Sequence, residues 1–456
     1  MRNRIARTQA QGTNLRLKVI TGVSGSQSSS AGILDWSFTE LNGAGSISST
    51  YPINLPQSGS QTAVDLNIPM KFFGLTENAS WLAQFAGQGF EDVAALVNLI
   101  LLQEALMAEE YMLIGGISSA SGIGAPTVVS ATGRTSLGSG ETAITTTSGN
   151  LYFAVSAKNF FGETTEATFT AVAAAASQVV DLIWDAVPGA LEYNVYAGTG
   201  TADPGRTAKY HVATVGGTKY TVQGILPTSG SVAPSADSGT ASANRYDGIQ
   251  SVLQGLPATS AYPSGYMGGY VRNGVGNTLS YPVIEDALAG LWDNSGLYNS
   301  STAVSGANQG FRASPTEIIA SGYDVKNLSD DILKNQNNGA AYRLFVEQDQ
   351  LQGITYGGAV STVLNPINRA SLNLTVHPLL PQGNAMLMSY TLPMTFSNVN
   401  LAWQVFNVQD YLSISWPVVD ITFRYSIFLY GSLVGAAPQY SAWISGLQRS
   451  GATPYS

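Results

Sequence analysis

The sequence predicts an α+β protein with an inserted all-β sandwich, and three observations support that fold class. One long helical pattern spans residues 90–116, alternating apolar and polar residues precede it, and residues 124–238 are rich in Thr, Val, Gly and Ala. Alternation with period two is typical of strands, and a succession of short strands separated by turn signals is typical of a β-sandwich. The chain therefore divides into a mixed body and a separate β domain.

The composition limits the classes of function. The 456 residues allow two or three domains, only 11% of them are charged, and the net charge is −9. A polar but sparsely charged surface suits a subunit that lies against neighbours, whereas a protein that grips nucleic acid needs a basic face. Cysteine is absent, which excludes disulfides, thiolate nucleophiles and Cys-based metal sites.

Residues 1–33 are expected to form an extended arm. They include Arg2, Arg4 and Arg7, and no acidic residue precedes Asp35. A basic, polar start without a long apolar run is unlike a secretory signal peptide. We expect this arm to bind a neighbouring molecule or an anion.

Residues 34–74 are expected to form an extended hairpin. Leu34, Trp36 and Phe38 alternate with polar residues, residues 64–72 do the same, and the connection between them is rich in turn residues. An isolated two-stranded hairpin is marginally stable in water. We therefore expect the hairpin to lie on another subunit.

The long helix follows at residues 90–116, FEDVAALVNLILLQEALMAEEYMLIGG. Acidic residues begin the helix, where its dipole favours negative charge. Gly115 and Gly116 end it, because glycine tolerates the left-handed conformation that often follows the last helical residue. Its longest stretch without a charge, residues 93–103, is 11 residues, whereas a membrane span needs about 20. We expect a scaffold helix packed on a sheet, and no membrane partner.

Seven short strands are predicted in the β domain, at residues 127–131, 151–158, 167–173, 179–184, 192–197, 210–214 and 219–223. The stretch DLIWDAVPGALEYNVYAGTG, with Trp184 in one strand and Tyr193 in the next, resembles the core of fibronectin type III or immunoglobulin-like (Ig-like) modules. NLYFAVSAKNFFGET resembles the last two strands of those modules, although here it comes first. Small-residue linkers flank the domain, so we expect a body without residues 125–235 to fold.

The residues after the β domain are expected to form a body that contains both helices and strands. Helices are expected at residues 244–255 and 282–298, and a strand, a turn and a helix at residues 314–338. Strands are expected at residues 342–346, 371–377, 385–391, 400–406 and 414–437.

A catalytic centre is not indicated. His211 and His377 are the two histidines, and they fall in different predicted domains. There is no Gly-x-Ser-x-Gly elbow and no Gly-Lys dipeptide, so a serine hydrolase and a P-loop are unsupported. Neighbouring acids such as Glu109 and Glu110 point in different directions on a helix. We expect no enzyme activity, cofactor or metal.

The order of parts resembles the tailed-bacteriophage major capsid proteins of the HK97 fold. The segments KFFGLTENASWLAQFAGQ, LTVHPLLPQGNAMLMSY and ITFRYSIFLYGSLVGAAPQYSAWISGL are similar to passages of that family. The resemblance implies the following division: an N-terminal arm at 1–33, an E-loop hairpin at 34–74, a P-domain with the spine helix at 75–123, the inserted domain at 124–238, the P-domain return and start of the A-domain at 239–298, the A-domain at 299–395, and C-terminal P-domain strands at 396–456.

The resemblance also implies function and partners. A protein of this family is a shell protein that assembles into pentamers and hexamers of an icosahedral head around double-stranded DNA, without sequence-specific binding. The implied partners are copies of itself, a portal, and scaffolding or decoration proteins, in a virion assembled in the bacterial cytoplasm. The inserted domain would lie on the outer surface.

Two sets of residues are expected to make the inter-subunit contacts, one in the arm and one in the hairpin. They are Arg2, Arg4, Arg7, Trp36, Phe38, Tyr51, Leu66, Ile68 and Met70. On the helix, the polar arc should face solvent or packed genome and the apolar positions should pack on the sheet. The arc contains Glu91, Asp92, Asn98, Gln103, Glu109 and Glu110, and the packing positions are Leu96, Ile100, Met107 and Leu113.

Two alternatives remain open. An encapsulin-type compartment shares the fold but encloses enzymes, so co-purified cargo protein in place of nucleic acid would indicate it. A secreted adhesin or carbohydrate-binding protein built on the fibronectin-like module is the other, and glycan binding by the isolated β domain would indicate it.

Overall fold

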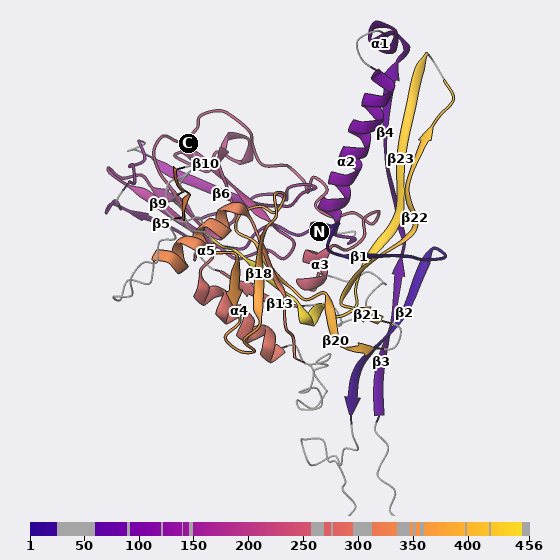
Figure 1. Cartoon of the computed structure of the whole chain (residues 1–456). Coiled ribbons are helices and arrows are strands. Elements are labelled where there is room, and N and C mark those ends of the chain that lie inside the picture. The colour runs from indigo at the N-terminus through magenta and orange to yellow at the C-terminus, as the bar shows by residue number, and fades with distance from the viewer. Residues whose placement is uncertain are drawn as a thin grey trace, which may run out of the picture.

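The computed structural model describes residues 1–24, 60–88, 92–119, 122–138, 140–145, 149–256, 269–274, 277–294, 312–334, 347–349, 353–355, 360–396, 399–418 and 421–448. It has a body from which two projections extend in opposite directions (Figure 1). A long helix and long strands form one projection, and a two-stranded hairpin forms the other. The strands of the inserted domain lie to one side of the body.

A four-stranded sheet runs through the first projection. In order across the sheet, its strands are β1 (Ala6–Gln9), β22 (Trp403–Ser415), β23 (Thr422–Gly435) and β4 (Lys71–Ser80). β1 is parallel to β22, and the other neighbours are antiparallel. Gly74 pairs with Phe428, whose ring covers the glycine so closely that a Cβ would not fit. The sheet thus joins the N-terminal and C-terminal parts of the chain.

Two helices follow β4 and complete this projection: α1 (Trp81–Ala86) and α2 (Val93–Gly115). The carboxylate of Asp92 accepts two backbone N–H groups from the first turn of α2, which is the usual role of an N-cap residue. The helix packs on β4 and β23, where Leu101 and Ala105 cover Ile427. The predicted long helix is confirmed, although it begins at Val93 and not at Phe90.

The second projection is the hairpin of β2 (Asn14–Ser24) and β3 (Ser60–Pro69), which are antiparallel. Leu17 pairs with Leu66, and both side chains are buried in the main core of the chain. One strand of this hairpin therefore comes from the segment predicted to be an arm. The strand predicted around Leu34, Trp36 and Phe38 lies outside the described residues.

The body contains a six-stranded mixed sheet with helices packed against it. Across the sheet, the strands are β13 (Tyr270–Asn273), β24 (Ala442–Ser445), β19 (Ala385–Met388), β14 (Glu317–Ala320), β18 (Ser371–Val376) and β17 (Thr362–Leu364). The helices are α3 (Ile249–Leu253), α4 (Tyr281–Asn294) and α5 (Gly322–Lys334). α3 and α4 contact β24, and α5 contacts β18. All four residues of β19 are buried, so this strand lies at the centre of the core.

Short elements complete the body. They are the pairs β15 (Glu347–Asp349) with β16 (Gly353–Thr355) and β20 (Thr391–Phe396) with β21 (Val399–Leu401), and the 3-10 turn η2 (Pro438–Tyr440). The helix predicted at residues 244–255 is shorter than expected, and the predicted strand at residues 385–391 is divided into β19 and β20. The strand predicted at residues 342–346 lies outside the described residues.

The inserted domain consists of two antiparallel sheets around one apolar core. One sheet has β11 (Tyr210–Val215), β10 (Glu192–Gly200), β6 (Asn150–Lys158), β7 (Ala167–Thr168) and β8 (Val172–Ala173). The other has β12 (Lys219–Val222), β9 (Val179–Trp184) and β5 (Val128–Arg134), and the 3-10 turn η1 (Arg206–Ala208) precedes β11. The seven predicted strands are confirmed, and the third is divided into β7 and β8.

Trp184 lies at the centre of that core. It is 2% exposed, and its ring contacts the rings of Phe169 and Tyr193 edge to face. Edge-to-face contacts are favourable because the positive edge of one ring meets the negative face of the other. The resemblance to fibronectin type III or Ig-like modules implied a core position for Trp184, and its burial confirms that position.

The chain enters and leaves the inserted domain through one neck. The N–H of Gly248 donates to the carbonyl of Gly116 at 2.8 Å, and the Asp247 carboxylate accepts the backbone N–H and hydroxyl of Ser118 at 3.0 and 2.8 Å. Asp247 also accepts the hydroxyl of Ser251 at 2.9 Å. These bonds hold the segment that enters the inserted domain beside the segment that leaves it.

We expect Asp247→Ala to lower the free energy of unfolding by about 3 kcal/mol, because it removes the carboxylate that accepts three hydrogen bonds from Ser118 and Ser251. Chemical denaturation of the full chain measures this change. Asp247→Asn, which keeps an acceptor oxygen in the same place, should lose less than half as much. Equal losses in the two variants would show that the hydrogen bonds at the neck contribute little.

Candidate functional site

Helix α2 is the element on which the candidate site is built, because its two ends have opposite environments. The last turns are enclosed by the N-terminal segment and the body, whereas the first turns project into solvent. Glu109 and Glu110 lie near the carboxyl end of the helix. Negative charge is unfavourable there, because the helix dipole already places partial negative charge at that end. Both carboxylates therefore need positively charged partners.

Glu109 is 0% exposed and obtains those partners from the N-terminal segment. Arg7 Nη2 lies 2.6 Å from one carboxylate oxygen, and Arg2 Nε lies 3.1 Å from the other. The hydroxyl of Tyr411 on β22 donates to Glu109 at 2.6 Å, and the Arg2 guanidinium lies over the Tyr411 ring. A buried carboxylate with this number of donors is compensated for the loss of hydration.

Glu110 forms a second group of contacts beside the first. It accepts the backbone N–H of Arg2 at 3.0 Å and His377 Nε2–H at 2.7 Å, and it pairs with the amine of Met1. The backbone N–H of Leu379 donates to His377 Nδ1 at 3.3 Å, so Nε2 carries the imidazole proton. Burial raises the pKa of Glu110, but these hydrogen bonds and the amine outweigh burial and lower it to about 2.

Arg4 forms the third group of contacts. It pairs with Glu317 on β14, which also accepts the hydroxyls of Thr375 at 2.6 Å and Tyr390 at 2.8 Å. The first seven residues thus place three arginines on acids from α2 and β14. We call these three groups of contacts, around Glu109, Glu110 and Arg4, the charge groups. They fix the path of the N-terminal segment into β1, which then pairs with β22.

The predicted orientation of the helix is wrong in two respects. Glu109 and Glu110 were assigned to a solvent-facing arc, but Glu109 is buried and Glu110 faces the N-terminal segment and His377. Leu96, Ile100 and Met107 were assigned to the packing face, but they are 37%, 42% and 48% exposed. The prediction is confirmed for Leu113, which is 0% exposed, and for Asp92 and Gln103 of the polar arc, which are exposed.

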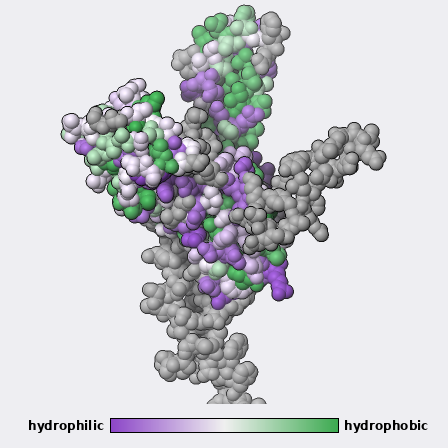
Figure 2. All heavy atoms as spheres, turned by 90° about the vertical axis from the view of Figure 1, so that its left-hand side faces the viewer, coloured by the Kyte–Doolittle hydropathy of each residue, from purple (hydrophilic) through white to green (hydrophobic). Residues whose placement is uncertain are grey.

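The outer face of α2 is consequently apolar. Leu96, Leu99 and Ile100 form a continuous surface on it, and Leu99 is 54% exposed. At the tip of the projection, α1 adds Trp81 and Phe85, whose rings stack with centroids 5.3 Å apart. Figure 2 shows this apolar surface along the projecting part of the molecule. A contiguous exposed apolar surface commonly marks an interface with another molecule.

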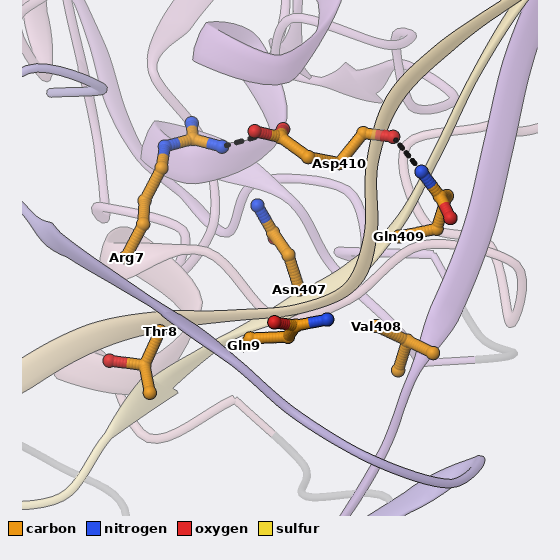
Figure 3. Close-up of a pocket in the computed structure, with 7 residues that line it drawn as sticks. All are labelled: Arg7, Thr8, Gln9, Asn407, Val408, Gln409 and Asp410. Carbon is orange, nitrogen blue, oxygen red and sulfur yellow. Dashed lines mark hydrogen bonds and ion pairs between the residues drawn. The ribbon is translucent and has the colours of Figure 1, made fainter.

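A polar pocket of about 390 Å³ lies beside the charge groups, where the pairing of β1 with β22 ends at Asn407 and the register of β22 against β23 shifts. Figure 3 shows Arg7 and Asp410 facing each other across it, with their charged groups 4.0 Å apart. The amide oxygen of Asn407 lies over Gly431, where a Cβ would not fit. The pocket thus belongs to the edge of the four-stranded sheet.

The predicted contact residues fall into three groups. Arg2, Arg4 and Arg7 pair with acids of their own chain. Leu66, Ile68 and Met70 are buried in the core of the single chain, at 0%, 3% and 7% exposure. Trp36, Phe38 and Tyr51 lie outside the described residues. For all nine, contact with a second subunit stays a prediction.

Sequence reasoning missed the partners of the three arginines. Complementary charge could have indicated these partners. The N-terminal segment is basic and contains no acid, and the long helix has two acids at the end where its dipole disfavours negative charge, so each needs charges of the opposite sign. Sequence reasoning also missed Tyr411 and Glu317, for which the sequence carries no such signal. His377 makes a structural hydrogen bond to Glu110.

Two searches of the described ranges give negative results. No helix in them is long and apolar enough to cross a membrane. No three His, Cys, Asp or Glu side chains among the described residues are placed to hold one metal ion.

His211 lies in the inserted domain beside Thr214, and burial lowers its pKa.

No family model matches this sequence, and no curated protein matches it. Among solved structures, the chain is similar to the capsid of a native GTA particle, with 7% identity and a TM-score of 0.41 over 98% of this chain and 89% of that one. It is also similar to the capsid of Myoviridae phage XM1, with 10% identity and a TM-score of 0.37 over 97% and 90% of the two chains. The holo-SrpI encapsulin complex from Synechococcus elongatus gives 7% identity and a TM-score of 0.37 over 100% and 89%.

These likenesses span most of each chain, but their TM-scores are below 0.5.

We expect Glu109→Gln to lower the free energy of unfolding by about 3 kcal/mol, because it leaves Arg2 without a counter-charge and Arg7 with only the exposed carboxylate of Asp410 at 4.0 Å. Denaturant titration of the full chain measures the loss. Glu104→Gln is the matched control, since Glu104 is exposed on the same helix and should change stability by less than about 0.5 kcal/mol. Equal effects of the two substitutions would contradict the structural role of Glu109.

We expect Glu110 to contribute an acid-sensitive share of stability. Its pKa is lower in the folded chain than the ordinary value of 4.5, so this share is complete above pH 4.5 and is lost as the pH falls through about 2. Unfolding of wild type and Glu110→Gln between pH 6 and pH 2 measures it. The difference in stability between the two proteins should shrink over that range, and a constant difference would contradict the assignment.

Proposed function

We propose that this chain is the major capsid protein of a tailed bacteriophage with an HK97-like fold. On this proposal, copies of the chain assemble into pentamers and hexamers of an icosahedral shell that encloses double-stranded DNA. The assembly would occur in the host cytoplasm, and the finished protein would reside in the virion. The other partners would be a portal and, where assembly requires them, scaffolding or decoration proteins.

The apolar outer face of the projecting helix is the observation that carries the proposal. Leu96, Leu99, Ile100 and Met107 are between 37% and 54% exposed on a helix whose far end is fixed in the body. A freely diffusing protein would leave this surface in water, at a cost of about 25 cal/mol for each Å². A lattice of identical subunits would cover it in every copy, and many such contacts would add up to a stable shell.

Charge supports the same function. The chain has a net charge of −9, and its N-terminal arginines are already paired with acids. An acidic subunit binds phosphate weakly, so a packed genome could move past it during entry and release. Enclosure of DNA is therefore compatible with the absence of a basic groove among the described residues.

The inserted domain is proposed to be an Ig-like module on the outer surface of the shell. Two antiparallel sheets with a central Trp184 support the Ig-like assignment. The domain lies beside the body, away from both projections (Figure 1). A module in that place could vary without disturbing the contacts that the projections make.

We expect Leu99→Glu to abolish assembly without unfolding the subunit. Leu99 is 54% exposed, so the single chain loses little by the change, whereas a buried charge in a subunit contact costs several kcal/mol. Light scattering and electron microscopy of the purified protein measure assembly, and circular dichroism measures folding. Glu104→Gln on the same helix is the control and should assemble normally.

Shells formed by Leu99→Glu at the wild-type yield would contradict a role of this face in assembly. The contents of wild-type shells test the finer proposal. Nucleic acid inside them is expected, whereas co-purified cargo protein in its place would indicate an encapsulin-type compartment.

A further inference from the structure

The inserted domain touches the body at a second place, far along the chain from its neck. The turn between β11 and β12 contains Gly216 and Gly217. A Cβ on Gly216 would lie 1.9 Å from the carbonyl oxygen of Gln382, and a Cβ on Gly383 would lie 2.7 Å from backbone atoms of Gly216. The two backbones therefore meet directly, at positions where no side chain fits on either chain segment.

The contact continues on the neighbouring residues. Gly217 forms a parallel β-bridge with Gly446, and the N–H of Leu447 donates to the carbonyl of Gly383 at 3.1 Å. Gly383 and Gly446 have φ values of 94° and 69°, which favour glycine. We call the four residues Gly216, Gly217, Gly383 and Gly446 the glycine clasp.

One buried acid holds the body side of the clasp. Asp324 is 1% exposed, and its carboxylate accepts the N–H of Gly383 at 2.9 Å and the hydroxyl of Ser321 at 2.6 Å. No charged side chain is among the partners of this carboxylate in the described part of the chain. Asn384 follows Gly383 in the chain, and its side-chain amide donates to the carbonyl of Leu191 in the inserted domain at 2.8 Å.

We propose that the glycine clasp locks the inserted domain onto the body, and that Asp324 makes this lock sensitive to pH. The neck alone would leave the domain attached at one end, whereas the clasp fixes its far turn as well. The domain would then be held in one orientation and would not swing on its linkers. This inference holds for the single chain, whether or not the chain forms a shell.

The direction of the pH effect follows from the burial of Asp324. Burial raises its pKa from 3.8 to about 6, although the bonds from Ser321 and Gly383 act in the opposite direction. A carboxyl whose pKa is raised on folding favours the closed state below pH 3.8, and this advantage is lost as the pH rises through 6. The clasp should therefore open more often at pH 7 than at pH 4.

The other titratable groups of the same segment lie at its opposite end. Residues 377–384 begin at His377, which contacts Glu110 and Met1, and end at the clasp. The low pKa of Glu110 keeps that carboxylate charged across the range in which Asp324 titrates. The Asp324→Asn variant separates changes in the clasp that depend on Asp324 from changes that depend on His377.

Hydrogen exchange of the full chain, read by mass spectrometry and corrected for the intrinsic effect of pH, tests the proposal. In wild type, the opening constant at the amides of Gly383 and Leu447 should rise about a hundredfold from pH 4 to pH 7, because the pKa of Asp324 differs by about two between the open and the closed clasp, and each unit of that difference contributes tenfold. Asp324→Asn should remove that rise. The matched control is Asp330→Asn on the same helix, where the acid pairs with Lys326 in solvent, and it should keep the rise.

A second variant tests the lock without titration. Gly216 does not have a positive φ, so Gly216→Ala fits the inserted domain itself but clashes with Gln382 in the closed clasp. Exchange at Gly383 and Leu447 should become at least tenfold faster, while β6 and β10 keep their protection. Unchanged exchange at Gly383 and Leu447 in Gly216→Ala, or a hundredfold rise that persists in Asp324→Asn, would overturn the proposal.

Discussion

The buried carboxylate of Glu109 is the constraint on which the arrangement of the chain depends. A charge without access to water, placed at the negative end of a helix, is tolerated only when cations and hydrogen-bond donors surround it. Arg2, Arg7 and Tyr411 meet that requirement. Two of these residues come from the N-terminal segment and one from β22, so a single side chain fixes where both elements lie relative to α2.

The consequences extend along the four-stranded sheet. Once Arg7 is held, β1 lies beside β22 in parallel register, and β22 is antiparallel to β23, against which α2 packs. The carboxyl end of α2 is thereby locked into the body. The amino end has no such requirement and can project with apolar side chains on its outer face. The same helix thus serves as an anchor at one end and as a contact surface at the other.

Much of the fold could be predicted from local pattern. The strands of the inserted domain were predicted from short strand patterns between turn signals, and α2 was predicted from a long helical pattern with acidic residues at its start and glycines at its end. The orientation of α2 could not be predicted in the same way, since apolar residues occur on nearly every side of it. Burial of Glu109 depends on arginines a hundred positions away, and spacing along the helix carries no information about them.

The second docking of the inserted domain was missed for a related reason. Gly116 was predicted only to end the long helix, and Gly248 was predicted to lie in a helix, but the structure shows that two backbones pass close together at these glycines in the neck. Gly216 and Gly383 follow the same rule at the clasp. A glycine in sequence permits both flexibility and close packing, and only the three-dimensional structure distinguishes them.

A cryo-electron microscopy map of the purified, assembled protein at side-chain resolution would show whether the outer face of α2 is a subunit contact. We expect closed shells in which Leu96, Leu99 and Ile100 are buried against a neighbouring subunit while Glu109 keeps its contacts with Arg2 and Arg7. Shells in which this face of α2 remains in solvent would contradict it, as would a protein that stays monomeric at every concentration.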